Sequence, residues 1–416
     1  MKTLLKVKFA WFPVWSTALL MLSMISIYLP VFGGNEQKMT NFPLIIVSED
    51  EEFESSDMGK AMINNLTEQQ DGHSIQWKIE SSEKNAVQAI KENKAYGALV
   101  IPADFSQSLS VLKSDLMAEQ TEGKPAEMKI LINEGGGQMA TSIAANVLES
   151  IASSTSSAVS NTLKDTMSQQ GLHVSPLVTS LLDEPIEYSS SNVLGLSTNV
   201  NKGMTPFMMV LVASITGLMG AQMIQGYLGG ISEGIRKAGY PLSNSKLLLT
   251  EILLGVILAF LVSSTLQLAV FGVFGSAHST SIWNIFFFTL LCSMTMFFMF
   301  KVIGLLFGKW GMLVMFPINI LGIFASGGAI PLATLPAFHH FFSLFLPTRY
   351  MVDGMRSLLF YGGNMQSGLG TALWVISIYL VAFLAVCMIF LIRSTKKGSP
   401  SKAGSLDKHA DQTVAL

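Results

Sequence analysis

The chain has 416 residues, half of them hydrophobic, and only 13% of its residues are charged. Soluble domains usually contain about 25% charged residues, so this composition argues against a soluble protein and favours one that lies in lipid. The two cysteines, Cys292 and Cys387, both lie in apolar runs. The polar part of the chain therefore has no disulfide framework, and the cysteine inventory excludes a zinc cluster.

Charge is unevenly distributed along the chain, although the formal net charge is only −2. Residues 34–203 contain 23 acidic and 11 basic residues, whereas the rest of the chain contains 5 acidic and 15 basic residues. The sequence therefore divides into an acidic polar part and an apolar part with basic edges.

Six apolar stretches are candidates for transmembrane helices, which need about 20 residues to cross a bilayer. We predict them near residues 9–32, 205–228, 247–274, 282–307, 312–324 and 369–392. Basic residues are enriched in the cytoplasmic segments of membrane proteins. Six spans with both termini in the cytoplasm would place 12 of the 15 basic residues outside residues 34–203 in cytoplasmic segments. The lysines before the first stretch also suit a signal peptide. We favour an uncleaved helix, because the stretch is long and no small-residue cleavage site follows it.

Residues 34–203 alternate between short apolar runs typical of strands and polar stretches typical of helices. Strands are predicted at 42–47, 74–80, 96–102 and 128–133, and helices at about 55–70, 81–93, 104–116 and 138–170. This alternation favours an α/β domain, which the charge distribution places outside the cytoplasm. The predicted fold class is a polytopic α-helical membrane protein with six transmembrane helices and an inserted extracytoplasmic α/β domain.

No pattern in the sequence predicts a catalytic, metal or cofactor site. His73 and His173 are isolated and are interpreted as exposed loop residues, and the acidic run 49–52 as a solvated face. Residues 135–137, GGG, follow a predicted strand and suit a tight turn, but they lack the lysine and hydroxyl of a phosphate loop. Residues 304–309, GLLFGK, have three residues between the glycines where a Walker motif needs four.

The stretch between the second and third predicted spans carries three charged residues at i, i+3 and i+4, which would share one helix face: Glu233, Arg236 and Lys237. Gly239 and Pro241 are expected to end this helix, and Ser243 or Asn244 to cap the next one. Two interpretations stay open. One is a short helix parallel to the membrane that contacts a cytoplasmic partner, and the other is a plain interfacial loop.

Lys301 lies inside the fourth predicted span, where a charged residue is a functional candidate. It could line a substrate path or pair with Glu251. It could also extend its amine to the nearby cytoplasmic surface, and we favour this last interpretation.

Residues 326–363 are too broken by proline for a normal span and too apolar for a free loop. We predict a re-entrant or interfacial helix pair on the outer side, because irregular backbone at membrane depth must be buried in protein or line a cavity. Arg349, Asp353 and Arg356 can share one helix face and satisfy each other. The histidines His339 and His340 are interpreted as interfacial residues rather than ligands.

The layout of one span, a large outer domain and five further spans resembles the permease subunits of ABC type-2 exporters. The sequences FGKWG, SGGAIPLATLP, LPTRYMVDGMR and YGG resemble the end of that family, especially its phage-infection-protein-like branch. In addition, EGIRKAGYPLS resembles the coupling helix that sits on the ATPase subunit, and YGALVIPADFS resembles a strand–helix junction of the outer domain.

The resemblance implies roles for three groups of residues. Coupling to the ATPase is expected from Glu233, Arg236, Lys237 and Pro241. The outer gate or re-entrant region is expected to use Gly327, Gly328, Pro331, Pro336, Pro347, Arg349, Asp353 and Arg356. Lys301 and Glu251 are possible pathway residues.

The resemblance also implies partners and a location. A separate cytoplasmic ABC ATPase would hold ATP and magnesium, and the permease would pair with a second copy or a sister subunit in the lipid bilayer. No cofactor on this chain and no nucleic-acid partner are expected. The expected location is a bacterial plasma membrane, with both termini in the cytoplasm and an amphiphile as exported substrate.

The expected organisation is a cytoplasmic N-terminus and first span (1–33), an extracytoplasmic domain (34–203), a five-helix membrane domain (204–393) and a disordered cytoplasmic tail (394–416). The membrane domain would contain the coupling segment (231–246) and the re-entrant region (326–368). An alternative is a non-transporting scaffold or surface receptor whose outer domain is the functional part. A membrane enzyme is poorly supported, because no catalytic groups converge in the sequence.

Overall fold

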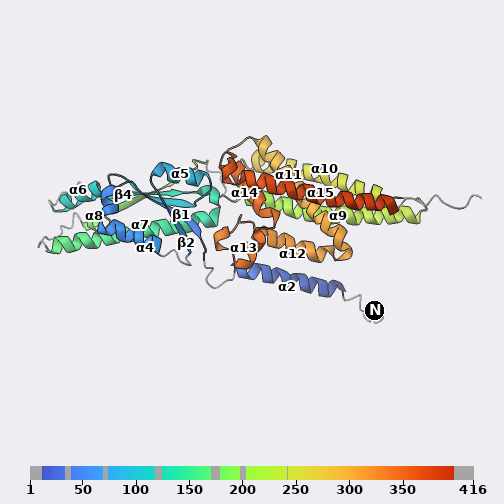
Figure 1. Cartoon of the computed structure of the whole chain (residues 1–416), viewed down its shortest axis with the longest axis horizontal. Coiled ribbons are helices and arrows are strands. Elements are labelled where there is room, and N and C mark those ends of the chain that lie inside the picture. The colour runs from blue at the N-terminus through green and yellow to red at the C-terminus, as the bar shows by residue number, and fades with distance from the viewer. Residues whose placement is uncertain are drawn as a thin grey trace, which may run out of the picture.

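The computed structural model describes residues 12–32, 39–68, 74–117, 124–169, 179–196, 203–240 and 242–397. A region built around a β-sheet occupies one end of an elongated molecule, and a bundle of long helices occupies the other end (Figure 1). The chain enters the sheet region after its first helix, α2 (Phe12–Phe32), and leaves it before α9 (Thr205–Lys237).

The sheet has five strands in the order β2-β1-β3-β4-β5. Strands β1 and β2, β1 and β3, and β4 and β5 pair in parallel, whereas β3 and β4 pair antiparallel. The strands span Phe42–Ser48 (β1), Ile75–Glu80 (β2), Gly97–Ile101 (β3), Ala126–Ile132 (β4) and Ile186–Asn192 (β5). The helices that connect them are α3 (Glu51–Ser55), α4 (Asp57–Glu68), α5 (Glu83–Lys91), α6 (Phe105–Met117), α7 (Gln138–Gln169) and α8 (Thr179–Asp183).

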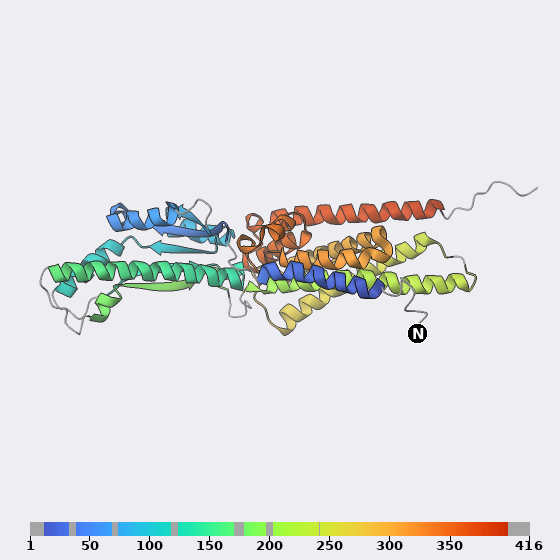
Figure 2. The same cartoon turned by 90° about the horizontal axis from the view of Figure 1, so that it is seen from below.

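Both faces of the central strands are covered by helices. In β1, Leu44 and Ile46 join a buried cluster with residues of α7, while Ile45 and Val47 join a second cluster with residues of α5. Successive side chains of a strand point to opposite faces, so a strand covered on both sides reads as a continuous apolar run. The long helix α7 runs along the sheet region (Figure 2).

The four predicted strands are confirmed, but β5 was missed. Its sequence, IEYSSSN, is polar and mostly exposed at the edge of the sheet, so it lacks the apolar signal of a buried strand. The helix predicted at 55–70 corresponds to α4, and the short helix α3 before it was not predicted. The acidic run at 49–52 supplies the cap of α3, Asp50, and its first two residues, Glu51 and Glu52. Acidic residues in a first helical turn are favourable, because the amides there carry partial positive charge.

Asp50 connects two helix ends in this region. Its carboxylate accepts hydrogen bonds from the backbone amide of Phe53 at 2.8 Å, in α3, and from that of Ser106 at 2.5 Å, in α6. Burial raises the pKa of Asp50, but the hydrogen bonds from Ser106 and Phe53 outweigh it and hold the pKa below its ordinary value.

The bundle contains four described helices that are long and apolar enough to cross a membrane. They are α9, α10 (Asn244–Gln267, continued by a π-helical turn to Val273), α11 (Ile282–Phe307) and α15 (Leu369–Lys397). Two apolar segments are shorter, in α2 and in α12 (Gly311–Phe324). With 14 residues, α12 is only about 21 Å long. The expectation of six spans is therefore not confirmed and stays a prediction.

Helix α11 lies at the centre of the bundle, where it packs against α9, α10, α12, α14 (Pro347–Phe360) and α15. Its buried side chains include Phe288, Cys292 and Met296. Gly255 of α10 faces the ring of Phe297, and a Cβ at this glycine would lie 1.9 Å from a ring carbon. The missing side chain thus lets α10 and α11 approach closely.

Residues 326–363 form two helices, α13 (Ala337–Ser343) and α14, after a 3-10 turn at Leu332–Thr334. The predicted helix pair is confirmed, whereas its depth in a membrane stays a prediction. The prolines begin elements, as their fixed φ angle favours: Pro331 precedes the 3-10 turn, Pro336 precedes α13, and Pro347 is the first residue of α14.

Candidate functional site

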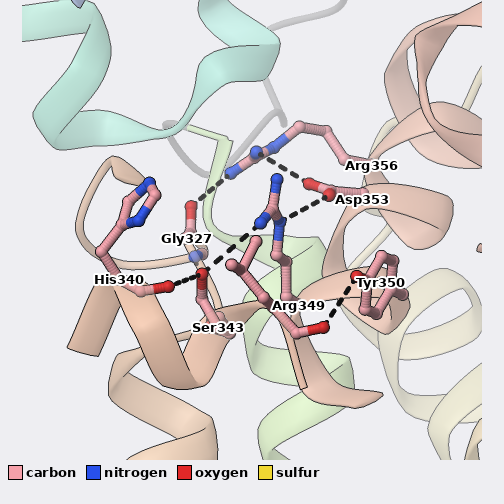
Figure 3. Close-up of polar contacts among 10 residues, drawn as sticks. Gly327, His340, Ser343, Arg349, Tyr350, Asp353 and Arg356 are labelled. Atoms are coloured by element: carbon pink, nitrogen blue, oxygen red, sulfur yellow. Dashed lines mark hydrogen bonds and ion pairs between the residues drawn. The ribbon is translucent and has the colours of Figure 1, made fainter. Parts of the chain in front are cut away.

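A cluster of charged side chains holds α14 in place beside the loop that precedes α13 (Figure 3). The carboxylate of Asp353 lies between two guanidinium groups, 3.9 Å from Nε of Arg349 and 3.9 Å from Nη1 of Arg356. The predicted ion pairing of these three residues is confirmed, but both contacts are longer than hydrogen bonds, and Nε of each arginine is buried with no hydrogen-bond partner in the described part of the chain. Arg356 is buried, and its Nη2 donates a hydrogen bond to the carbonyl oxygen of Gly327 at 3.2 Å.

Each of the two glycines in this loop is needed for a different structural reason. Gly327 has a φ of +74°, a conformation that other residues rarely adopt. Gly328 packs against α9, where a Cβ would lie 2.4 Å from a ring carbon of Phe207. The loop therefore brings the Gly327 carbonyl to Arg356 and lies directly on α9.

Helices α13 and α14 are joined at their facing ends. Arg349 Nη1 donates to Oγ of Ser343 at 3.4 Å, and Ser343 donates to the carbonyl of His340 at 2.7 Å (Figure 3). The hydroxyl of Tyr350 donates to the carbonyl of Leu344 at 3.0 Å. These contacts make α13 and α14 one connected unit.

The expectation that both histidines are interfacial is wrong for His339. This side chain is fully buried, and its Nε2 lies 2.9 Å from the carbonyl oxygen of Ile27 in α2. The sequence could not show this contact, because the two residues are 312 positions apart. His340, in contrast, is exposed.

The sheet region docks onto the end of α14 through Tyr361, the first residue of the YGG motif, to which the sequence assigned no role of its own. The Tyr361 hydroxyl lies 2.9 Å from Oδ1 of Asn133 and 2.9 Å from Oδ1 of Asn93. A tyrosine hydroxyl has one proton to donate. The amide nitrogen of Asn133 already donates to the carbonyl of Ala95 at 3.0 Å. Oδ1 of Asn133 is therefore fixed as the acceptor, and Asn93 can complete the site by donating from its amide.

The glycines at 135–137 form the other side of this junction, and the predicted tight turn is confirmed as a 3-10 turn. A Cβ at Gly135 would lie 2.8 Å from the Tyr361 hydroxyl. Gly137 has a φ of +97°, and a Cβ there would lie 3.3 Å from the carbonyl oxygen of Gly328. Backbone of the sheet region thus touches the loop that Arg356 holds. The run of three glycines in the sequence indicates that another part of the chain approaches the backbone closely here, but it does not show which part.

Within the bundle, Lys301 and Glu251 form a buried ion pair that joins α11 to α10. Lys301 Nζ lies 2.6 Å from Oε2 of Glu251, and the two side chains are 1% and 6% exposed. Lys301 also donates to Oε1 of Gln225, in α9, at 3.3 Å. The favoured interpretation, in which the amine reaches the cytoplasmic surface, is therefore wrong, because a partner within reach satisfies the charge internally. Pairing with Glu251, the alternative, is confirmed.

The expected coupling residues lie at the end of α9. Glu233 and Lys237 form an ion pair at 2.8 Å with side chains that are 68% and 76% exposed, and Arg236 bonds to the side chain of Asn244 at the start of α10. A separate short helix is not formed, because α9 continues without a break to Lys237.

The end of that helix agrees with the sequence signals. Gly239 has a φ of +87° and follows the last helical turn. Ser243 caps α10, its hydroxyl accepting from the amide of Ser245 at 3.3 Å. Pro241 lies outside the described residues, as do His73 and His173.

A family model described as "ABC-2 family transporter protein" matches residues 10–393. The chain belongs to this family. No curated protein and no solved structure matches the chain.

The match includes both the sheet region and the helical bundle of this ABC-2 transporter protein. Membership identifies a multi-pass membrane protein, of the permease type rather than an enzyme.

Proposed function

We propose that the chain is the permease subunit of an ATP-driven exporter that moves an amphiphile outward together with a separate ATPase subunit. The observation that carries the proposal is the family match over residues 10–393, which includes the elements expected to couple, conduct and gate. ATP and magnesium would bind to the partner, and the permease would act as a pair with a second copy or a sister subunit. The residues quoted for the resemblance support a place in the phage-infection-protein-like branch.

The proposed topology has six spans and both termini in the cytoplasm of a bacterial plasma membrane. Helices α2 and α12 would complete the set of spans, and they pack against each other in the bundle. The start of α2, the charged end of α9 and the end of α15 all lie at the end of the bundle remote from the sheet region (Figure 1). This arrangement supports a cytoplasmic location for that end and an inserted, extracytoplasmic α/β domain at the other.

The end of α9 is the proposed contact with the ATPase. Its charged side chains are exposed, and an exposed ion pair at i, i+4 contributes only about 0.3–0.5 kcal/mol. The ion pair of Glu233 and Lys237 could therefore break at little energetic cost, and each side chain could pair with a charged group of a partner. Arg236 bridges α9 and α10, so a force applied here would act on both helices.

The unit formed by α13, α14 and the loop at Gly327 and Gly328 is the proposed outer gate. Arg356 joins the loop to α14, and Tyr361 joins α14 to the sheet region. A displacement of α14 would therefore displace the sheet region, which we place over the exit.

Replacement of Glu233 and Arg236 by alanine tests this function. We expect cells that depend on the protein for protection against an exported amphiphile to lose that protection, because the ATPase no longer drives the permease. The amount of protein in the membrane should stay unchanged, as measured by immunoblot of membrane fractions. A double variant that inserts normally and still protects the cells would contradict the coupling role. Loss of protection in variants of the sheet region alone would favour a receptor or scaffold.

A further inference from the structure

A cavity of about 470 Å³ lies between the ends of α11, α14 and α15. Its volume is within the range of about 300–1,000 Å³ that is common for small-molecule sites. The walls include Phe288 and Leu291 of α11, Leu358 of α14 and Leu373 of α15. None of the residues that line it is charged.

The rim of the cavity is held in place by hydrogen bonds between the loop before α11 and the end of α14. The hydroxyl of Thr280 donates to the carbonyl of Leu358 at 2.7 Å. The amide of Gly362 donates to Oγ of Ser279 at 2.9 Å. Gly362 and Gly363 have φ angles of +64° and +69°, so the chain turns sharply here without side chains that would fill the opening. The cavity is thus a formed feature of the fold.

One side-chain amide at the rim is available to a ligand. Asn284 lines the cavity on the first turn of α11, and in the described part of the chain no residue makes a hydrogen bond to its amide group. Thr280, the other polar side chain of the lining, already uses its proton. A ligand here would therefore place an uncharged hydrogen-bonding group at Asn284 and an apolar group against the inner wall.

The position of the cavity indicates where such a ligand comes from. Two helices long enough to cross a membrane, α11 and α15, begin beside it. Trp283 is adjacent to Asn284 and is 69% exposed, and Phe287 of the lining is also exposed. Exposed tryptophan at the end of a transmembrane helix is typical of the membrane–water interface. At that level of the bilayer, the ester groups of the lipids adjoin their acyl chains. An ester group at Asn284 would therefore be followed by an acyl chain along the apolar inner wall.

We propose that this cavity binds one acyl chain of a bilayer phospholipid, with the ester carbonyl of that chain hydrogen-bonded to the Asn284 amide. The chain would extend past Phe288 toward Leu373, in contact with the apolar wall. This site depends on the protein being in a membrane and does not depend on the exporter function.

Photolabelling of the full-length protein tests the site. The protein is placed in phosphatidylcholine vesicles that contain a phosphatidylcholine with a diazirine in one acyl chain, and labelled peptides are mapped by mass spectrometry. We expect labelling that saturates and concentrates in residues 282–291 and 358–373. Labelling that does not saturate and is spread evenly over the exposed apolar faces of α10 and α15 would overturn the proposal.

Two variants separate a bound chain from general lipid contact. Leu373→Trp places a larger ring in the inner part of the cavity, against the path of the acyl chain, and should reduce the saturable labelling. Leu253→Trp, at a side chain that is 58% exposed on α10, should leave it unchanged. Asn284→Leu, at an exposed position that does not threaten the fold, should weaken binding of the ester lipid about fivefold, the value of one ordinary hydrogen bond.

An ether-linked phosphatidylcholine, which lacks the ester carbonyl, should bind equally to the wild type and to Asn284→Leu. Thermal unfolding of each variant in detergent confirms that it is folded. If both Leu373→Trp and Asn284→Leu label like the wild type, the cavity is not the lipid site.

Discussion

The buried pair of Lys301 and Glu251 makes a strong prediction about stability. In Glu251→Met, the ammonium of Lys301, which is only 1% exposed, loses its counter-charge and keeps only the weaker bond to Gln225. Removal of one partner from a buried ion pair typically costs about 3–5 kcal/mol, because the remaining charge is left without solvent or partner. We therefore expect Glu251→Met to lower the free energy of unfolding by that amount.

The double variant Lys301→Met with Glu251→Met separates this cost from lost packing. Replacement of a buried pair by apolar residues of similar size is often neutral or stabilising. The double variant should therefore regain most of the stability that the single variant loses. The exposed pair of Glu233 and Lys237 is the matched control, in which Glu233→Met should cost no more than about 0.5 kcal/mol.

Unfolding in mixed micelles with increasing dodecyl sulfate, followed by tryptophan fluorescence, measures these differences. The result that would refute the reasoning is a loss of less than about 1 kcal/mol in Glu251→Met, of the size seen for surface pairs. A second refuting result is a double variant that is as unstable as the single one, because packing alone would then explain the loss.

Three further predictions concern the sheet region and its junction, and unfolding of the full-length protein in detergent measures each of them. Tyr361→Phe should cost about 1–3 kcal/mol, because the buried oxygen of Asn133 loses its donor; a loss near zero would show that water replaces the hydroxyl. Gly137→Ala should cost about 1–3 kcal/mol, because its φ of +97° and ψ of +153° are essentially restricted to glycine; an unchanged stability would contradict that conformation. The lowered pKa of Asp50 stabilises the fold above the ordinary carboxyl pKa of about 4, and this contribution is lost as the pH falls through the folded-state pKa. Asp50→Asn should therefore lower stability at neutral pH and make it less sensitive to acid, and a parallel shift at all pH values would refute the assignment.

Hydropathy predicted the long helices well, because their signal is carried by about 20 consecutive residues and needs no knowledge of partners. The same signal placed the end of the second helix too early. The second predicted span ended near residue 228, where the apolar run ends, yet α9 continues to Lys237. The segment 226–234 contains four glycines, each of which costs about 1 kcal/mol relative to alanine in a helix, and the 33-residue helix nevertheless continues through them.

The contacts that define the candidate site were less accessible to sequence reasoning. Arg349, Asp353 and Arg356 were predictable because their pairing depends on helical spacing alone. The bond between Tyr361 and Asn133 crosses 228 residues, and no local pattern records it. Lys301 and Glu251 are 50 residues apart, so the choice between internal pairing and exposure depended on how α10 and α11 pack.

The most direct test of the proposed function is to purify the tagged protein from its native membrane in a mild detergent and identify what accompanies it by mass spectrometry. We predict an ABC ATPase in stoichiometric amount, lost in Glu233→Ala with Arg236→Ala. It should be retained in Glu92→Ala with Lys94→Ala, which removes a surface pair of the sheet region. Absence of an ATPase, under conditions that preserve a known exporter complex, would contradict the proposal that this chain is a permease driven by a separate subunit.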